Sequence, residues 1–155
     1  MPLVSKGSMS SATGPATSAR ILICEDSPIE QAALSLYLRQ QGYDVDVTSD
    51  GEATIEHLKS HPVDAILLDL RVPRSDGFEV LSYLQEHRRT LPVIVVSGMP
   101  LDEIQQHMQR MPRPELPPLL LKPFDPDQLL QLLELELSGG IPEIKPQDES
   151  PDRAG

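Results

Sequence analysis

Short stretches of strand length alternate with segments of helical period through the middle of this sequence. Five such stretches occur, at 21–24, 43–47, 65–68, 93–96 and 119–121, and all but the second are apolar at every position. A strand that is apolar throughout is typical of a sheet covered on both faces. Because the connections are short, the alternation predicts a doubly wound α/β fold: a five-stranded sheet, mostly or wholly parallel, with helices on both faces.

Capping residues indicate where helices begin. Ser27-Pro28 and Asp125-Pro126 each place a capping side chain before a proline, the order typical of a helix N-terminus. The predicted helices run from 28 to the stop at Gly42, from 50 to 60, from 77 or 78 through 84, from 101 to 111, and from 126 to about 137. We expect apolar stripes on the first helix (Ile29, Ala32, Ala33, Leu36) and on the fourth (Leu101, Ile104, Met108, Met111).

Composition changes at both ends of this region. Residues 1–19 are rich in Ser, Gly, Ala, Thr and Pro with one charged side chain, Lys6, so burial cannot repay the entropy of ordering them. Residues 139–155 combine three prolines and three glycines with four acids and two bases. We predict one domain over 20–138, a flexible tail at 1–19 whose start to about Ser8 is typical of a cloning remnant, and a flexible acidic tail at 139–155.

The charge balance narrows the possible partners. The net charge is -11, from 24 Asp and Glu against 13 Lys and Arg, which weighs against direct nucleic acid binding because phosphate neutralisation needs clustered cations. No apolar run approaches the roughly 18 to 20 residues that span a bilayer, so we expect no membrane insertion. The single cysteine, Cys24, excludes an internal disulfide and fits a reducing compartment. We therefore expect a cytoplasmic protein.

Four of the five predicted strands end in side chains suited to metal or phosphate chemistry. Glu25 and Asp26 follow the first strand, Asp69 the third, Ser97 the fourth and Lys122 the fifth. Parallel strands place these ends at one edge of the sheet, where ligand sites of this fold class lie. Three carboxylates gathered there repel one another unless a divalent cation joins them, and carboxylate ligands suit Mg²⁺. The sequence therefore predicts a magnesium site.

The same residues suit phosphoryl transfer. Ser97 supplies a neutral donor and Lys122 a positive one for the oxygens of an incoming phosphoryl group. Asp69 is the natural nucleophile, because its strand is expected at the centre of the sheet with partners on either side, and the product would be an aspartyl phosphate. The alternative, in which such carboxylates only cap the following segment, would require five suitable residues to meet at four strand ends by accident.

At these residues the sequence resembles the receiver domains of bacterial two-component response regulators. The resemblance rests on four motifs in order: Glu25-Asp26, the run DLRVPRSDG from Asp69 to Gly77, the strand PVIVVSG that contains Ser97, and Lys122-Pro123-Phe124. Together they are specific, although each alone is weak, and they span nearly all of 20–138. The resemblance implies the flavodoxin-like receiver fold, either as a stand-alone domain or as part of a longer protein.

The resemblance also implies how the acceptor works. Asp69 would take a phosphoryl group from a phosphohistidine on a sensor histidine kinase or a phosphotransfer protein, with no turnover of an external substrate. Asp26, Asp69 and the backbone carbonyl of Arg71 would bind Mg²⁺, and Glu25 would act mainly through a bound water. The phosphorylated domain would then change its affinity for a downstream protein partner, as a monomer or weak dimer.

Further residues receive roles by the same resemblance. Lys122 would contact the phosphoryl oxygen, and Ser97 would move toward it. The Lys122–Pro123 peptide bond is commonly cis in this family. The loop after the acceptor would be shaped by Pro73, Asp76 and Gly77.

Leu119 departs from the family pattern at a position, three residues before the lysine, that is usually aromatic and turns inward on phosphorylation. An aromatic rotamer switch cannot operate there, which leaves a phosphorylation-independent interaction module on the same fold as an alternative. A phosphatase of the Asp-nucleophile type is another alternative, but it needs a second acid two residues after the first, where Arg71 stands.

Other features have ordinary explanations. The proline-rich segment 111–118 is a stiff connector or, less favoured, a partner-recognition loop. His57 and His61 are spaced for a shared metal, but a solvated helix face is favoured because no third ligand is apparent. Cys24 is predicted to be buried with a raised thiol pKa. The leucines of the last helix exceed one stripe, and the excess fits core packing or a dimer or partner surface.

Overall fold

The computed structural model describes residues 18–71 and 77–139 of the chain. Its strands are β1 (Arg20–Cys24), β2 (Asp44–Thr48), β3 (Ala65–Leu68), β4 (Val93–Ser97) and β5 (Leu119–Leu121). They form one sheet in the order β2-β1-β3-β4-β5, and every neighbouring pair is parallel. The predicted α/β sheet is therefore confirmed, and it is parallel throughout.

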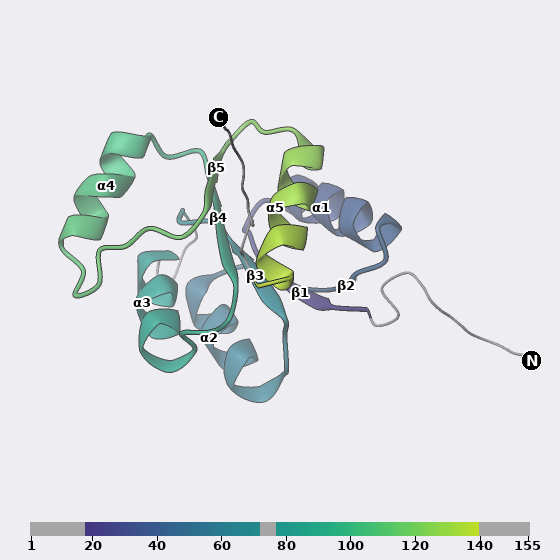
Figure 1. Ribbon diagram of the computed structural model, residues 1–155, viewed down its shortest axis with the longest axis horizontal. Helices are drawn as coiled ribbons and strands as arrows, with labels where there is room; N and C mark the ends of the chain where they lie inside the picture. The colour runs from purple at the N-terminus through teal and green to yellow at the C-terminus, as the bar shows by residue number, and fades with distance from the viewer. Residues whose placement is uncertain (1–17, 72–76, 140–155) are drawn as a thin grey trace, which may run out of the picture.

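Helices cover both faces of this sheet (Figure 1). The helices are α1 (Pro28–Gln40), α2 (Gly51–Ser60), α3 (Gly77–His87), α4 (Leu101–Gln109) and α5 (Pro126–Leu137). Side chains of α1 and α5 share one core layer with Ile23 and Leu67, while α2, α3 and α4 share the other with Leu22 and Ile66. The division follows from the alternation of side chains along each strand, so both faces of the sheet are dry.

Side-chain caps fix the starts of three helices. Ser27, Asp50 and Asp125 each accept a hydrogen bond from a backbone N–H of the turn that follows. Pro28 and Pro126 occupy the first helical positions, where a missing N–H costs nothing. Both predicted starts with a cap and a proline are confirmed.

Helix α1 buries a different face from the one that its predicted stripe suggests. Ile29 and Leu36 are 82% and 60% exposed, and the two alanines of the stripe are exposed as well. Ser35 and Leu38 are buried instead. The stripe is wrong as a core face because α1 carries apolar residues on two sides, and Gln31 bonds to the backbone just after β1 and so turns its own side inward.

Helix α4 follows its predicted stripe except at its first residue. Leu101 is exposed, whereas Ile104 and Met108 are buried and Met111 is partly buried. The helix ends two residues earlier than predicted, and the connector 110–118 contains no regular helix or strand. Both explanations of the proline-rich segment, a stiff connector and a partner-recognition loop, stay predictions, because an irregular course fits either one.

The strand order determines where a ligand site can form. The chain leaves β1 toward β2 on one side and returns to β3 on the other, so the connections after β1 and β3 run in opposite directions. A crevice opens outside the carboxyl ends of two such strands. The predicted carboxylates follow these two strands.

Within the described residues, no helix is both long enough and apolar enough to cross a membrane. The predicted tails at 1–19 and 139–155 lie almost wholly outside the described residues and stay predictions.

Candidate functional site

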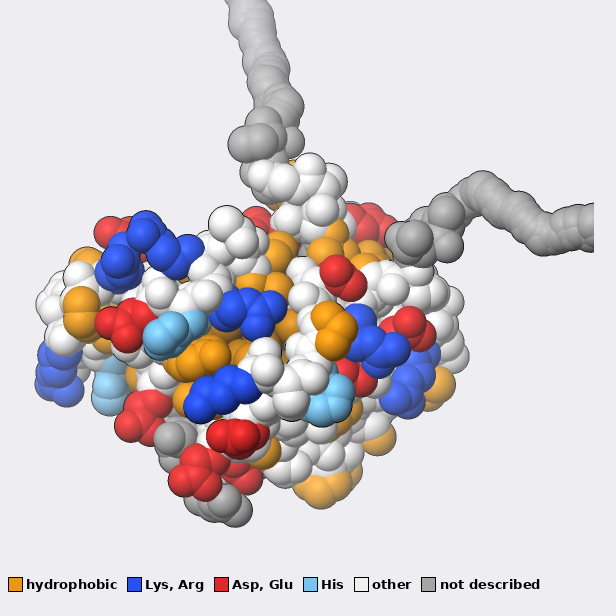
Figure 2. Space-filling view, turned by 90° about the horizontal axis from the view of Figure 1, so that it is seen from below, with side chains coloured by type: hydrophobic (Ala, Val, Ile, Leu, Met, Phe, Trp, Pro, Cys, Tyr) orange, Lys and Arg blue, Asp and Glu red, His pale blue; other side chains and the backbone are white. Residues whose placement is uncertain are grey.

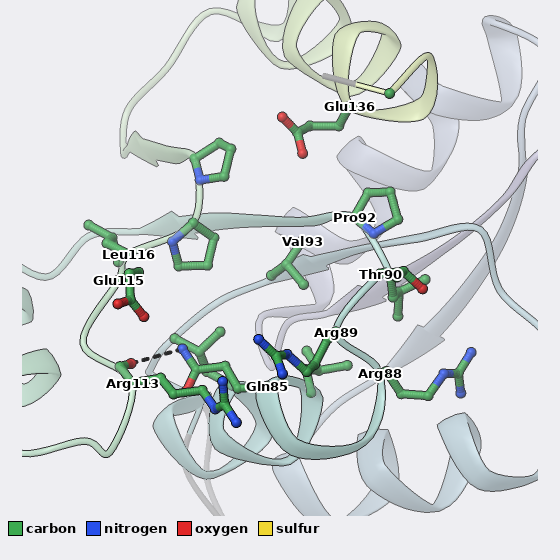
Figure 3. A pocket seen from close by; sticks show the side chains of 16 residues that line it. Gln85, Arg88, Arg89, Thr90, Pro92, Val93, Arg113, Glu115, Leu116 and Glu136 are labelled. Carbon is green, nitrogen blue, oxygen red and sulfur yellow. Dashed lines mark hydrogen bonds between the residues drawn. The ribbon is translucent and has the colours of Figure 1, made fainter. Parts of the chain in front are cut away.

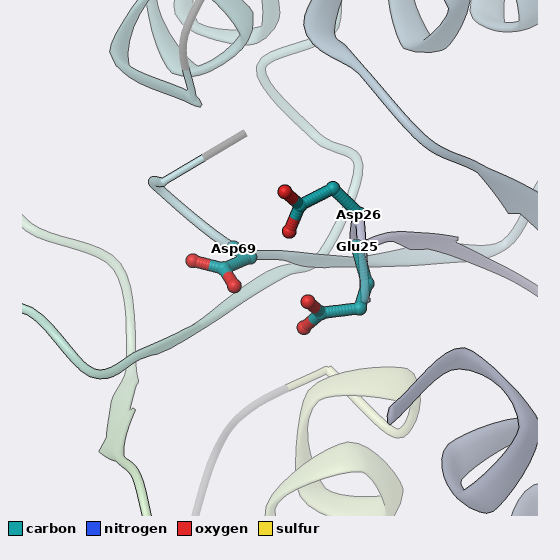
Figure 4. Close-up of side chains that lie close together, drawn as sticks. All are labelled: Glu25, Asp26 and Asp69. Carbon is teal, nitrogen blue, oxygen red and sulfur yellow. The ribbon is translucent and has the colours of Figure 1, made fainter. Parts of the chain in front are cut away.

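Three carboxylates converge where β1 and β3 end side by side (Figure 4). Glu25 and Asp26 follow β1 and Asp69 follows β3, and each offers an oxygen that lies within 4.8 Å of those of the other two. The Asp69 N–H donates to the carbonyl of Cys24 at 3.0 Å, which extends the parallel pairing beyond the strands. Glu25 and Asp69 are 1% and 4% exposed, whereas Asp26 is open to solvent. The site thus combines two buried carboxylates with one accessible one.

Lys122 reaches the carboxylates from the end of β5. Its ammonium donates to Glu25 Oε1 and to Asp69 Oδ2, each at 2.8 Å. Its backbone N–H donates to the carbonyl of Ser97 at 2.8 Å, which ties the ends of β4 and β5 together. The Lys122–Pro123 peptide bond is cis, as the resemblance implies.

The pKa values of Glu25 and Lys122 are both raised, although for different reasons. Burial raises the pKa of Glu25 to about 7, against the opposing hydrogen bonds from Lys122 and the Ser27 N–H. Burial lowers the pKa of Lys122, but its hydrogen bonds to Asp69, Glu25 and Glu30 outweigh that effect and the net shift is upward. Lys122 therefore remains a cation beside the acceptor.

Two partners orient the Asp69 carboxylate. Oδ2 accepts from Lys122, and Oδ1 accepts from the N–H of Arg71 at 2.9 Å. The guanidinium of Arg71 turns away and pairs with Glu103 at the start of α4, at 3.5 Å. Arg71 is therefore beside the acceptor through its backbone, while the expected role of its carbonyl in metal binding stays a prediction.

Gly77, predicted to shape the loop after the acceptor, begins α3 and lies against the backbone of Asp69 and Leu70. The Gly77 N–H donates to the carbonyl of Leu70 at 3.1 Å. A Cβ at position 77 would lie 2.6 Å from the carbonyl oxygen of Asp69 and would also overlap Leu70 Cα. Only glycine fits this approach. Pro73 and Asp76, predicted to shape the same loop, lie outside the described residues.

Ser97 is buried at the end of β4, and its hydroxyl accepts the N–H of Met99 at 3.1 Å. The structure brings Ser97 to the same sheet edge through its backbone bond to Lys122. Among the described residues, its hydroxyl bonds to Met99 and stays outside the network of Lys122 and the carboxylates.

Glu30 belongs to the site, and the sequence analysis missed it. It lies in the first turn of α1 and pairs with Lys122, so three carboxylates share this ammonium. Its spacing from Ser27 is that of a capping box, in which the glutamate turns back to the serine N–H. Here Glu25 Oε2 accepts that N–H at 3.2 Å, which leaves the Glu30 carboxylate for Lys122.

Other candidates from the sequence have structural roles. Cys24 is buried, and burial raises the pKa of its thiol to about 11, as predicted in direction. His57 stacks on His61 at 4.2 Å between ring centroids and bonds to Asp46 at 2.8 Å. Within the described chain, the carboxylate group is the one cluster that could hold a metal. Leu119 is partly buried and packs against the core layer that α2, α3 and α4 share.

A protein-family model, that of the response regulator receiver domain, matches residues 21–134. The transcriptional regulatory protein PdtaR of Mycobacterium tuberculosis is 29% identical over 133 residues, which cover 81% of this chain and 63% of PdtaR. The TorCAD operon transcriptional regulatory protein TorR of Escherichia coli O157:H7 is 42% identical over 78 residues, or 50% of this chain and 34% of TorR. The chain thus matches from a third to under two thirds of these relatives' length.

Solved structures share the same architecture. The receiver domain of the sensor histidine kinase PA1611 from Pseudomonas aeruginosa PAO1 covers 79% of this chain and 100% of its own length, with a TM-score of 0.69 and 26% identity. It was solved with a magnesium ion coordinated in its active-site cleft. A receiver domain from a Syntrophus aciditrophicus histidine kinase covers 86% of this chain and 99% of its own length, with a TM-score of 0.71 and 23% identity.

Proposed function

Because this chain belongs to the response regulator receiver-domain family, we propose that it is a phosphoacceptor in two-component signalling. Asp69 would take a phosphoryl group from a phosphohistidine on a sensor histidine kinase or a phosphotransfer protein. The observation that carries this proposal is the buried Asp69 carboxylate, held by Lys122 at 2.8 Å and grouped with Glu25 and Asp26. The proposal includes a cytoplasmic location and no direct contact of this domain with nucleic acid.

The carboxylate group suits a hard divalent cation. Its oxygens lie within 4.8 Å of one another, and one ammonium offsets only part of their charge. Such all-oxygen donor sets are what Mg²⁺ takes in proteins. Asp26, Asp69 and the carbonyl of Arg71 would hold the ion, with Glu25 acting through a water. When bound, the ion would neutralise charge on the phosphoryl oxygens.

The residues of the chain would orient the acceptor and balance its charge. A carboxylate oxygen of Asp69 attacks phosphorus, so that an O–P bond forms while the N–P bond to the donor histidine breaks and its electron pair returns to the imidazole. The N–H of Arg71 keeps Asp69 Oδ1 in position. Lys122, now bonded to Oδ2, would pair with a phosphoryl oxygen.

A phosphoryl group on Asp69 would change the hydrogen-bond partners at the ends of β4 and β5. Lys122 would exchange a carboxylate oxygen for a phosphoryl oxygen. The Ser97 hydroxyl, which now accepts a hydrogen bond from the N–H of Met99, would give up that bond. Because Leu119 cannot act as an aromatic switch, we propose that Ser97 and the α4 that follows it carry the change to a downstream protein.

The test is intact mass after incubation with a small acyl-phosphate donor, with and without Mg²⁺. We expect a gain of one phosphoryl group that requires both the metal and Asp69, so that Asp69→Asn abolishes it. Asp102→Asn, at an exposed aspartate in α4, is the matched control and should gain the group normally. A gain that survives in Asp69→Asn, or a wild-type chain that neither gains the group nor binds Mg²⁺, would contradict the proposal.

The two alternatives have less support. A phosphorylation-independent module would not require Glu25, Asp69 and Lys122 to be gathered at one site. Leu119 is the one residue that favours this alternative. An Asp-nucleophile phosphatase needs a carboxylic acid where Arg71 stands, and that side chain pairs with Glu103.

A further inference from the structure

A pocket of about 450 Å³ lies at the edge of the sheet where β4 begins, opposite to the carboxylate site. Its walls are the end of α3 with the turn into β4, the connector before β5, and the end of α5 at Glu136 and Gly139 (Figure 3). Figure 2 looks onto this lower face of the molecule and shows Lys or Arg side chains beside exposed hydrophobic ones. The proposed phosphotransfer uses no part of this pocket.

Two arginines of the pocket have no carboxylate partner among the described residues. Arg89 and Arg113 extend toward each other from two of its walls in Figure 3, and neither forms an ion pair with a residue that the structure describes. Glu115 and Glu136 also line the pocket but pair with neither arginine. In a chain of net charge -11, two guanidinium groups that lie over an apolar wall and have no ion-pair partner in 18–71 or 77–139 favour an anion that carries apolar groups.

The pocket walls are held together without these two guanidinium groups. The side-chain amide of Gln85 donates to the carbonyl of Arg113 at 3.0 Å, which fixes the connector to α3. Arg88, the third arginine of the pocket, donates to the carbonyl of Leu58 at 3.0 Å and is thereby committed to α2. The guanidinium groups of Arg89 and Arg113 therefore contribute no hydrogen bond to the described fold.

The nearest segment of complementary chemistry is residues 140–155 of this chain, which follow directly on the pocket-lining Gly139. Gly139 has a φ of +107°, which favours glycine and turns the chain away from the axis of α5. Glu143, the first acid of the segment, lies between Ile141 and Ile144 in sequence. Four extended residues span about 13 Å, and they start from Gly139, which itself lines the pocket.

We propose that residues 140–155 dock in this pocket, with the Glu143 carboxylate paired to Arg89 and Arg113 and with Ile141 and Ile144 against the apolar wall. The docked segment joins the end of α5 to the connector before β5.

The test compares amide NMR spectra of three samples: the full chain, a chain that ends at Gly139, and the shortened chain with a synthetic peptide of residues 140–155. The shortened chain keeps every helix and strand of the structure. We expect the amide signals of Gln85, Thr90 and Leu116 to shift on shortening and to return as the peptide is added. Amides of the connector should exchange faster without the segment. Signals that stay in place on shortening would overturn the proposal.

Charge exchange tests the pairing itself. Arg113→Glu and Glu143→Arg should each remove the effect of the peptide, and the two together should recover part of it because the pair is restored with reversed sign. Arg110→Glu is the matched control, since Arg110 is an exposed arginine at the end of α4 that does not line the pocket. A loss of the effect in Arg110→Glu equal to that in Arg113→Glu would contradict a specific pair.

Other occupants give different results, and each would reject this segment. Signals that move with protein concentration would indicate a second copy of the chain. Signals that move with inorganic phosphate but not with the peptide would indicate a small anion. Equal binding of a peptide with the same residues in scrambled order would show that charge alone, and not the placement of Glu143, accounts for the contact.

Discussion

Arg71 lies between the acceptor and helix α4, with its N–H on Asp69 and its guanidinium on Glu103. We predict that Arg71→Ala changes the dephosphorylation rate of Asp69 by more than about twofold, a small change in barrier height, with little effect on stability. The variant keeps the backbone N–H but removes the guanidinium, and with it the ion pair that joins the residue two positions after the acceptor to the start of α4. The measurement is the decay of the phosphorylated chain by intact mass. Glu103→Ala separates the ion pair from the charge, and equal decay in wild type and Arg71→Ala would reject the prediction.

Gly77 is the position where the backbone tolerates no side chain. A Cβ there would stand 2.6 Å from the carbonyl oxygen of Asp69, so Gly77→Ala must push the start of α3 away from the backbone of Asp69 and Leu70. We expect a loss of about 2 kcal/mol or more in the free energy of unfolding, measured with denaturant. Gly98→Ala is the control, because a Cβ at position 98 would meet nothing within 4 Å. Equal losses in the two variants would show that the close approach at Gly77 does not matter.

Single residues differ in how far sequence alone could place them. Asp69 and Lys122 were predictable because each directly follows an apolar run, and parallel strands bring such ends together. Glu30 was not, because its position three residues after Ser27 suits a local cap equally well, and only the competing bond from Glu25 to the Ser27 N–H decides between the two. Arg71 was predictable as a neighbour of the acceptor but not as a partner of Glu103.

Asp46 on β2 joins three elements, because Arg20 of β1 and His57 of α2 both bond to it. Burial raises the pKa of Asp46, but these hydrogen bonds outweigh that effect and the net shift is downward. A carboxyl whose folded pKa is depressed stabilises the fold above its ordinary pKa and loses that contribution as pH falls through the folded value.

We therefore predict that Asp46→Asn lowers the free energy of unfolding at neutral pH, and that its difference from wild type shrinks as pH falls below about 4. Denaturant unfolding between pH 3 and pH 7 (roughly the range over which a carboxyl titrates) is the measurement. Asp44→Asn is the control, since Asp44 is more exposed and stands 3.6 Å from the same arginine. A difference that stays constant over this range would contradict the assigned cause.

Element boundaries were predictable where caps and prolines mark them, as at Pro28 and Pro126. The buried face of α1 was not, because Ile29 and Leu36 on one side and Leu34 and Leu38 on the other have similar hydropathy. The choice between the two faces rests on contacts that α1 makes with the ends of β1 and β2, which its own periodicity does not encode.

Cys24 reports on the integrity of the whole molecule. It is buried in β1, an interior strand between β2 and β3, and burial raises the pKa of its thiol to about 11. We predict that a thiol reagent at neutral pH labels the native chain far more slowly than the unfolded chain, because reaction requires the thiolate and an opened core. Labelling should accelerate in Gly77→Ala in step with its loss of stability. As a control, a cysteine placed at the exposed Ser138 should react at once, and fast labelling of native Cys24 would contradict the prediction.

At the scale of the whole chain, the topology was the most predictable property, since five apolar runs and short connections leave few arrangements of a parallel sheet. The pocket below α3 was not foreseen. Arg89 follows α3 and Arg113 belongs to an irregular connector, so no periodic pattern in the sequence links them. The hydrogen bond from Gln85 of α3 to the carbonyl of Arg113 joins the two segments in the structure.

The ammonium of Lys122 pairs with both Glu30 in α1 and Asp69 after β3, and so links these two parts of the fold. A phosphoryl group on Asp69 and the Glu30 carboxylate in the first turn of α1 would therefore compete for the same cation. If a phosphoryl group draws Lys122 away, Glu30 loses its counterion, and the start of α1 changes charge without any change in its own sequence. A protein that bound this helix would then meet a different charge at its first turn before and after phosphoryl transfer.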